Sequence, residues 1–170
     1  DEYDSIDDKT LNKIKAIDNC GAASTFRPLL MAAYLKVTPT DHRFDQIINS
    51  CEIFSYRAFE IMNRSTTLLR RKMKQEAHRL YVADKEVSEL NQLFGDVYLG
   101  NLYDDVDDAI TTICDLIDSN TGKRANDIDV IDHLTRRDVL NGDYTTGWGG
   151  FHNKTTIKYL IYEYERHLRQ

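Results

Sequence analysis

The segment 41-DHRFDQIINSCEIFSYRAFEIMNR-64 constrains the fold most, because its apolar residues recur at steps of three and four. That spacing places them on one face of an α-helix, whereas a β-strand would need a period of two. Either Asp41 or Thr40 can cap the predicted helix. The apolar stripe consists of Phe44, Ile47, Ile48, Cys51, Phe54, Ala58 and Ile61. A helix with such a stripe has to bury it, so the rest of the chain must supply packing partners.

The other periodic segments also predict helices, and no segment alternates as a strand would. Within them we place Pro28 in the first turn of a fully buried helix, Ser65 as the cap of the next helix, and a polar linker at 119–126. The sequence predicts a single all-α domain over 1–170, an irregular bundle of about six to seven helices. The further expected helices are 8–18, 26–37, 66–82, 85–98, 103–118 and a last one carrying Ile157, Leu160, Ile161, Tyr164 and Leu168, and the linker leads to the segment 127–140.

Composition narrows the class of protein. Hydrophobic residues make up 41% of the chain and charged residues 29%, which is typical of a globular domain rather than a disordered one. No apolar run approaches the roughly 18 residues that a membrane helix needs, so no membrane contact is expected. Cys20, Cys51 and Cys114 are odd in number and form no CxxC pair, which predicts reduced core thiols and a cytoplasmic location. The chain begins with acidic residues instead of Met, so we expect it to be a piece of a longer multidomain protein.

The patterns that would carry catalysis or metal binding are missing from the sequence. No two of the five histidines stand four residues apart, and no Cys/His cluster is present, so no metal is expected. Four acids, Asp104, Asp105, Asp107 and Asp108, fall in the predicted first turn of a helix, where the helix dipole favours carboxylates. No nucleophile elbow occurs. We therefore assign no catalytic residue and no cofactor, and do not expect this chain to be an enzyme by itself.

The strongest electrostatic feature is the basic run 64-RSTTLLRRKMKQEAHR-79, in which Glu76 is the only acid. The chain has a net charge of −6, so only a local basic face could attract a polyanion. The alternative is a solvated helix face balanced by the acidic helix at 103–118. The candidate nucleic-acid contacts are Arg64, Arg70, Arg71, Lys72, Lys74 and Arg79.

The glycine-rich stretch 147-GWGGFHN-153 does not fit a phosphate-binding loop, because it has no Walker Lys-Ser/Thr and no preceding strand. We interpret it as a lead-in to the last helix, which Asn153 can cap. Lys154 then lies in the first turn of that helix, where a cation is slightly disfavoured.

Four segments, in order, resemble the helical middle region of GmrSD-like proteins. The shared features are an F-x-P-L-L helix, the pair Tyr56 and Arg57 in a long helix, and an aromatic K-Y-x-x-Y-E-Y-E helix. The segments are 11-LNKIKAIDN-19, 26-FRPLLMAAYLK-36, 44-FDQIINSCEIFSYRAFEIMNRS-65 and 148-WGGFHNKTTIKYLIYEYERHL-168.

The resemblance implies a bacterial restriction or phage-defence protein in which a ParB-like domain precedes these helices and an HNH nuclease domain follows them. The catalytic motifs of both flanking domains are missing here, so no catalytic residue carries over. The implied function is a non-catalytic helical domain that positions the flanking nuclease domains and contacts DNA phosphates. The alternative is a stand-alone protein-interaction module that uses Tyr159 and Tyr162 as anchors.

Overall fold

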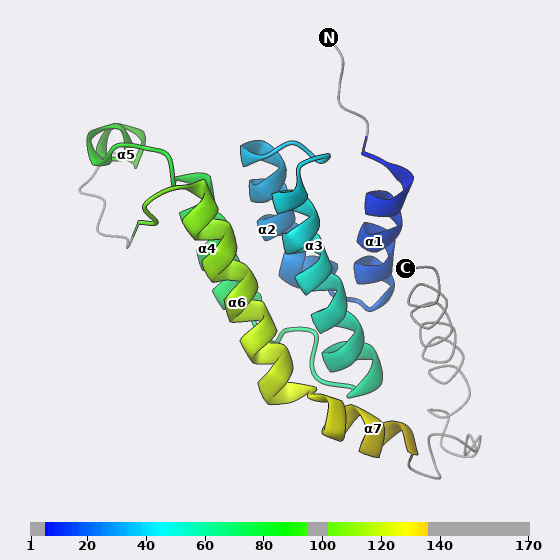
Figure 1. The fold of residues 1–170 in the computed structure, drawn as a ribbon. Helices are drawn as coiled ribbons and strands as arrows, with labels where there is room; N and C mark the ends of the chain where they lie inside the picture. The colour runs from blue at the N-terminus through cyan, green and yellow to red at the C-terminus, as the bar shows by residue number, and fades with distance from the viewer. Residues whose placement is uncertain (1–5, 95–101, 136–170) are drawn as a thin grey trace.

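The computed structural model describes residues 6–94 and 102–135, which fold into helices and connecting turns (Figure 1). The predicted all-α bundle is confirmed, since the described part holds seven α-helices and no strand. The helix expected at the C-terminal end lies outside the described residues. The helices are α1 (Asp8–Asn19), α2 (Ala23–Lys36), α3 (His42–Phe54) with a π-helical continuation η1 (Ser55–Ile61), α4 (Arg70–Tyr81), α5 (Val87–Phe94), α6 (Val106–Arg124) and α7 (Asp127–Thr135).

The core lies where α3 packs against α1, α2 and α6, and where α4 packs against α2 and α6. All seven residues of the stripe predicted from 41–64 are buried, which confirms the face that α3 presents to the core. Phe54 contacts Phe26 and Phe59 edge-on, at ring-centroid distances of 5.9 and 5.2 Å. Such aromatic pairs add about 0.5–1.5 kcal/mol each beyond the burial of their area.

The sequence predicted one uniform α-helix over 41–64, and this prediction is wrong. After Phe54 the chain widens into η1, where the Met62 N–H bonds to the Arg57 carbonyl five residues back. The buried Ser55 hydroxyl donates to the Cys51 carbonyl at 2.6 Å. A serine that bonds back in this way competes with the backbone pattern and often bends a helix. The predicted cap at Asp41 is confirmed, because its side chain accepts from the Arg43 N–H at 2.9 Å.

Two predictions for α2 are wrong. The helix begins at Ala23, so Pro28 lies inside it and not in its first turn. Nor is the helix buried all round, because Met31, Tyr34 and Leu35 are 59%, 42% and 65% exposed. One face of α2 packs on α3 and α4, while the exposed residues lie elsewhere on its surface. Apolar composition alone could not separate a buried helix from one with an uncovered face.

The predicted start of the fourth helix is also wrong. Ser65 bonds locally to the Thr67 backbone and hydroxyl, which forms a turn rather than a cap. Two residues with positive φ, Asn63 at 48° and Leu69 at 63°, interrupt the chain before α4 begins at Arg70.

The polar linker predicted at 119–126 is helical up to Arg124, because α6 continues through it. The side chains of Asn120 and Thr121 bond to the carbonyls four residues back, at 2.8 and 3.1 Å. This lets polar residues continue a helix that their composition disfavours.

Candidate nucleic-acid interface

The helices α2 and α4 run parallel, which brings their N-termini to the same end of the bundle (Figure 1). At that end the Thr25 hydroxyl donates to the Thr66 carbonyl at 2.5 Å. Arg70 Nη2 donates to the Ser24 hydroxyl there at 2.7 Å. At the other end the Lys36 ammonium pairs with Asp84 and lies 5.3 Å from the centroid of the Tyr81 ring. The two helix dipoles therefore point in the same direction.

Both of these N-termini lack a side-chain cap and an acidic residue in the first turn. Every other α-helix in the described part carries an acid there, and Asp7, Asp41 and Asp105 cap α1, α3 and α6. A helix N-terminus carries roughly half a positive charge and leaves backbone N–H groups unpaired. Two adjacent uncapped N-termini therefore favour an anion at this end of the molecule.

Three of the six predicted DNA contacts are exposed cations without a partner among the described residues, and they lie just before α4 or on it. Arg64, Arg71 and Lys74 are exposed, and their side chains form no ion pair or hydrogen bond with any of the described residues. Arg70 is half-buried, and its Nε is buried without an acceptor within 6–94 and 102–135. A buried donor without a partner is unfavourable unless a ligand or water supplies an acceptor.

The other two cations are bound to a carboxylate inside the protein. Glu76 is only 1% exposed, and it pairs with Lys72 at 2.7 Å and with Arg79 at 3.0 Å. The Tyr103 hydroxyl donates to the same carboxylate at 2.6 Å, and Arg79 lies 3.9 Å from the centroid of the Tyr103 ring. Burial raises the pKa of Glu76, but the hydrogen bonds from Lys72 and Tyr103 outweigh it, so the net pKa is lowered. Lys72 and Arg79 are thus both engaged by Glu76, whose single negative charge offsets one of their two positive charges.

The structure divides the predicted basic run into cations without a partner in the described part of the chain, which are Arg64, Arg71 and Lys74, and cations bound to Glu76, which are Lys72 and Arg79. A hollow of about 770 Å³ follows α4, and the described residues that line it all belong to this helix. Of its exposed cations, Arg71 in the first turn of α4 and Lys74 in the second turn have no partner among the described residues, whereas Lys72 pairs with Glu76. Spacing in the sequence could have signalled the pairing, because Lys72 and Arg79 stand four and three residues from Glu76. Tyr103 is 27 residues away, and nothing in the sequence links it to this cluster.

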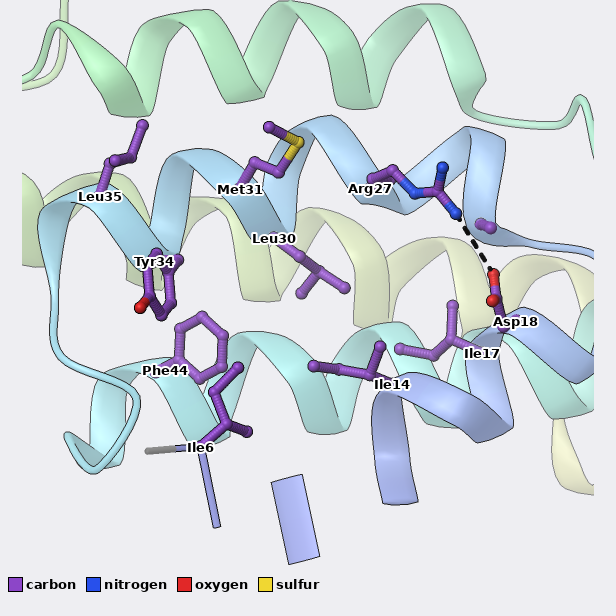
Figure 2. A pocket seen from close by; sticks show the side chains of 11 residues that line it. Ile6, Ile14, Ile17, Asp18, Arg27, Leu30, Met31, Tyr34, Leu35 and Phe44 are labelled. Carbon is purple, nitrogen blue, oxygen red and sulfur yellow. Dashed lines mark ion pairs between the residues drawn. The ribbon is translucent and has the colours of Figure 1, made fainter. Parts of the chain in front are cut away.

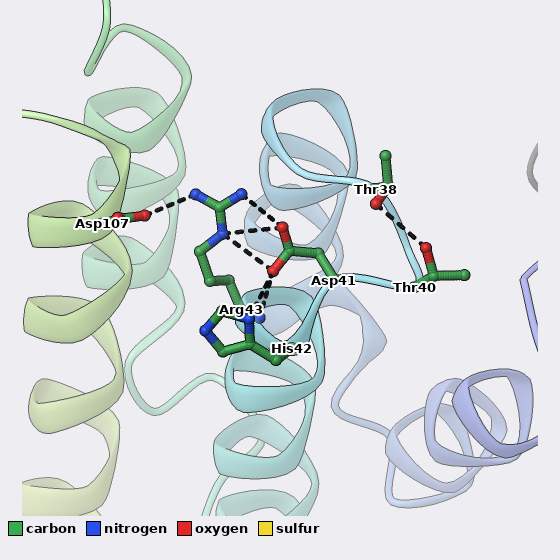
Figure 3. Close-up of polar contacts among 6 residues, drawn as sticks. All are labelled: Thr38, Thr40, Asp41, His42, Arg43 and Asp107. Carbon is green, nitrogen blue, oxygen red and sulfur yellow. Dashed lines mark hydrogen bonds and ion pairs between the residues drawn. The ribbon is translucent and has the colours of Figure 1, made fainter.

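A second polar cluster joins α3 to α6 at the opposite end (Figure 3). Arg43 binds Asp41 through Nε and Nη2, at 3.0 and 2.5 Å, and reaches Asp107 at 2.7 Å. Hydrogen bonds from the Arg43 side chain and backbone lower the pKa of Asp41 to about 2. Asp105 caps α6, and Asp107 and Asp108 lie in its first turn, as the acidic run predicted, while Asp104 precedes the cap. Arg43 bridges two carboxylates, so the cluster keeps a net negative charge and serves to fix two helix ends.

The three thiols are free, with Cys20 and Cys51 buried and Cys114 half-buried. Burial raises the pKa of Cys20 to about 12 and that of Cys114 to about 11, and it also raises the pKa of Cys51. Since the thiolate is the reactive form, these cysteines are inert core residues.

Among the described residues, no three histidine, cysteine or acidic side chains come together as a metal site, and no helix is long and apolar enough to cross a membrane. Several features singled out in the sequence lie outside the described part. They are the side chain of His133, the glycine-rich stretch 147–153, Lys154, Tyr159 and Tyr162.

Fold and site together define an all-α protein with a positively charged helix-terminal surface. Comparisons with protein-family models, with curated proteins and with solved structures find no match to this chain.

Proposed function

We propose that this chain is the non-catalytic helical domain of a GmrSD-like DNA restriction or defence protein. In this proposal it binds the phosphate backbone of duplex DNA where α2 and α4 begin, and holds the duplex for the flanking nuclease domains. Contacts to phosphates fix the position of a protein on DNA without reading its sequence. Sequence or modification specificity would then belong to the flanking domains.

One observation carries the DNA-binding part of this proposal. Two uncapped helix N-termini lie side by side, next to exposed cations that have no partner in the described part of the chain. Backbone N–H groups at a helix N-terminus and unpaired Arg and Lys side chains are the donors that proteins commonly offer to phosphate oxygens. Because the chain has a net charge of −6, binding to DNA must depend on this local surface.

The family context rests on the ordered resemblance of four sequence segments. Two of them, 26–36 and 44–65, form α2 and the continuous α3 and η1, which make up much of the core. A rigid bundle is suited to holding two flanking domains at a fixed separation, because buried stripes determine how the helices pack.

The DNA-binding part can be tested by fluorescence anisotropy with a labelled 20-base-pair duplex at low salt. The variant Arg71→Gln/Lys74→Gln removes two unpaired cations from the proposed surface. Its matched control, Lys9→Gln/Lys85→Gln, changes the net charge equally at the opposite end, where both lysines are in ion pairs with Asp45 and Glu89. The expected result is at least about tenfold weaker binding for the first variant only. Equal losses in both variants, or no binding by the unmodified protein, would contradict the proposal.

A further inference from the structure

An apolar groove lies between α1 and α2 (Figure 2). It extends along α2 from Ala23, the first residue of that helix, to Leu35. Its volume is about 300 Å³. Leu30 and the buried residues Ile17 and Phe44 are among the side chains that line it, while Arg27 and Asp18 form an ion pair at one end. The eleven lining residues are Ile6, Ile14, Ile17, Asp18, Ala23, Arg27, Leu30, Met31, Tyr34, Leu35 and Phe44.

Several large apolar side chains that line the groove are exposed, although apolar side chains of this size are usually buried. Met31 and Leu35 are each more than half exposed, and Tyr34 is 42% exposed. Single exposed apolar residues are normal, but several adjoining ones mark a surface that another element covers. A small ligand would leave much of this surface uncovered, because the lining residues of α2 extend from Ala23 to Leu35. At 1.5 Å per residue they span about 18 Å along the helix.

We propose that this groove seats residues 154–168 of the same chain as an amphipathic helix. The apolar stripe predicted for that segment consists of Ile157, Leu160, Ile161, Tyr164 and Leu168. Eleven residue steps separate its ends, which corresponds to about 17 Å in an α-helix. The stripe therefore matches the length of the α2 side of the groove. Laying an apolar helix face into a groove of this kind is a common recognition mode.

The tether favours this occupant over a second copy of the chain. Residues 136–156 connect the end of α7 to the segment and can reach roughly 70 Å when extended. This exceeds the length of the longest described helix, α6, which is about 28 Å for its 19 residues. A covalent linker long enough to span the distance gives an effective concentration of about the millimolar range, well above the micromolar concentrations of typical experiments. The same stripe on another molecule would compete poorly.

Site-specific photo-crosslinking in the full chain tests this placement. A benzoylphenylalanine replaces Met31 in the groove, and in a control protein it replaces Ile128 of α7, which is 72% exposed and lies outside the groove. After irradiation at micromolar concentration, the crosslinked peptides are identified by mass spectrometry. The expected products from position 31 are crosslinks within one chain to residues 154–168, whereas position 128 gives few or none.

Paired substitutions in the segment make the result specific. Ile161→Asp lies on the stripe, and Tyr159→Asp lies on the opposite side of the predicted helix. The first should reduce the crosslink yield by about tenfold or more, as expected for the loss of one buried isoleucine, and the second should leave most of it. Three results would overturn the proposal: crosslinks that join two chains, the absence of crosslinks to 154–168, or equal effects of the two substitutions. DNA binding through α4 does not depend on this outcome, so the two proposals can fail separately.

Discussion

The Glu76 cluster leads to a prediction whose size can be worked out from the structure. The substitution Tyr103→Phe removes one hydroxyl and keeps the ring that covers Arg79. The lost hydrogen bond is 2.6 Å long and ends on a buried carboxylate, so it belongs to the stronger, charge-assisted class. Hydrogen bonds to charged groups contribute about 1.5–3 kcal/mol. In a protein of this size each kcal/mol shifts the Tm by about 2–4 °C, so we expect a decrease of roughly 3 to 12 °C at pH 7.

Thermal unfolding followed by circular dichroism measures this effect, with Tyr81→Phe as the matched control. Tyr81 is 43% exposed, and its ring, not its hydroxyl, contacts Lys36. Removing the Tyr81 hydroxyl should change stability by less than about 0.5 kcal/mol. If the two variants have the same Tm, the Tyr103 hydrogen bond does not stabilise the fold and the assignment of Lys72 and Arg79 to an internal cluster fails.

The dependence of this effect on pH gives a second check. The folded state lowers the pKa of Glu76, so the stabilisation is present above the ordinary glutamate pKa of about 4.3. It is lost as the pH falls through the lowered pKa of the folded protein. The Tm difference between Tyr103→Phe and the unmodified protein should therefore be largest near pH 7 and shrink in acid. A difference that stays constant down to pH 3 would contradict an interaction with the ionised carboxylate.

Two further predictions concern backbone and caps. Gly21 has φ +68°, and a Cβ there would meet Thr66 at an ordinary 3.5 Å, so Gly21→Ala should cost about 1–2 kcal/mol through the backbone alone. Gly122→Ala, inside α6 with open space around it, should instead stabilise by about 0.5–1 kcal/mol, and urea unfolding of both variants checks the opposite signs. The ionised Asp41 side chain stabilises the fold at pH values above its ordinary pKa, and this contribution is lost as the pH falls toward about 2. Asp41→Asn should therefore flatten the acid limb of a curve of Tm against pH. An unchanged acid limb would contradict the pairing of Asp41 with Arg43.

Local patterns in the sequence were sufficient to predict most of the helices. The stripe from Phe44 to Ile61 was predicted correctly because helical spacing alone determines which side chains share a face. The extension of α6 was missed because Asn120 and Thr121 suggest a linker, and only their bonds to carbonyls four residues back show why they are helical.

The candidate site depended on contacts between residues far apart in the chain. The basic run was visible in the composition, but the sequence could not show that Tyr103 and Glu76 form a cluster that engages Lys72 and Arg79. Nor could it show that α2 and α4 run parallel, since that arrangement is seen in contacts such as Thr25 to Thr66, 41 residues apart. Pairing of helix N-termini is a tertiary property, and helical periodicity carries no information about it.

The salt dependence of DNA binding tests the central claim most directly. Log K for a labelled duplex is measured against log salt concentration, and each phosphate neutralised by Lys or Arg contributes a slope of about −0.9. Three unpaired cations, Arg64, Arg71 and Lys74, predict a slope of about −2.7, and Arg71→Gln/Lys74→Gln should reduce it to about −0.9. A slope near zero, or one that the double substitution leaves unchanged, would contradict the phosphate-binding role of this surface.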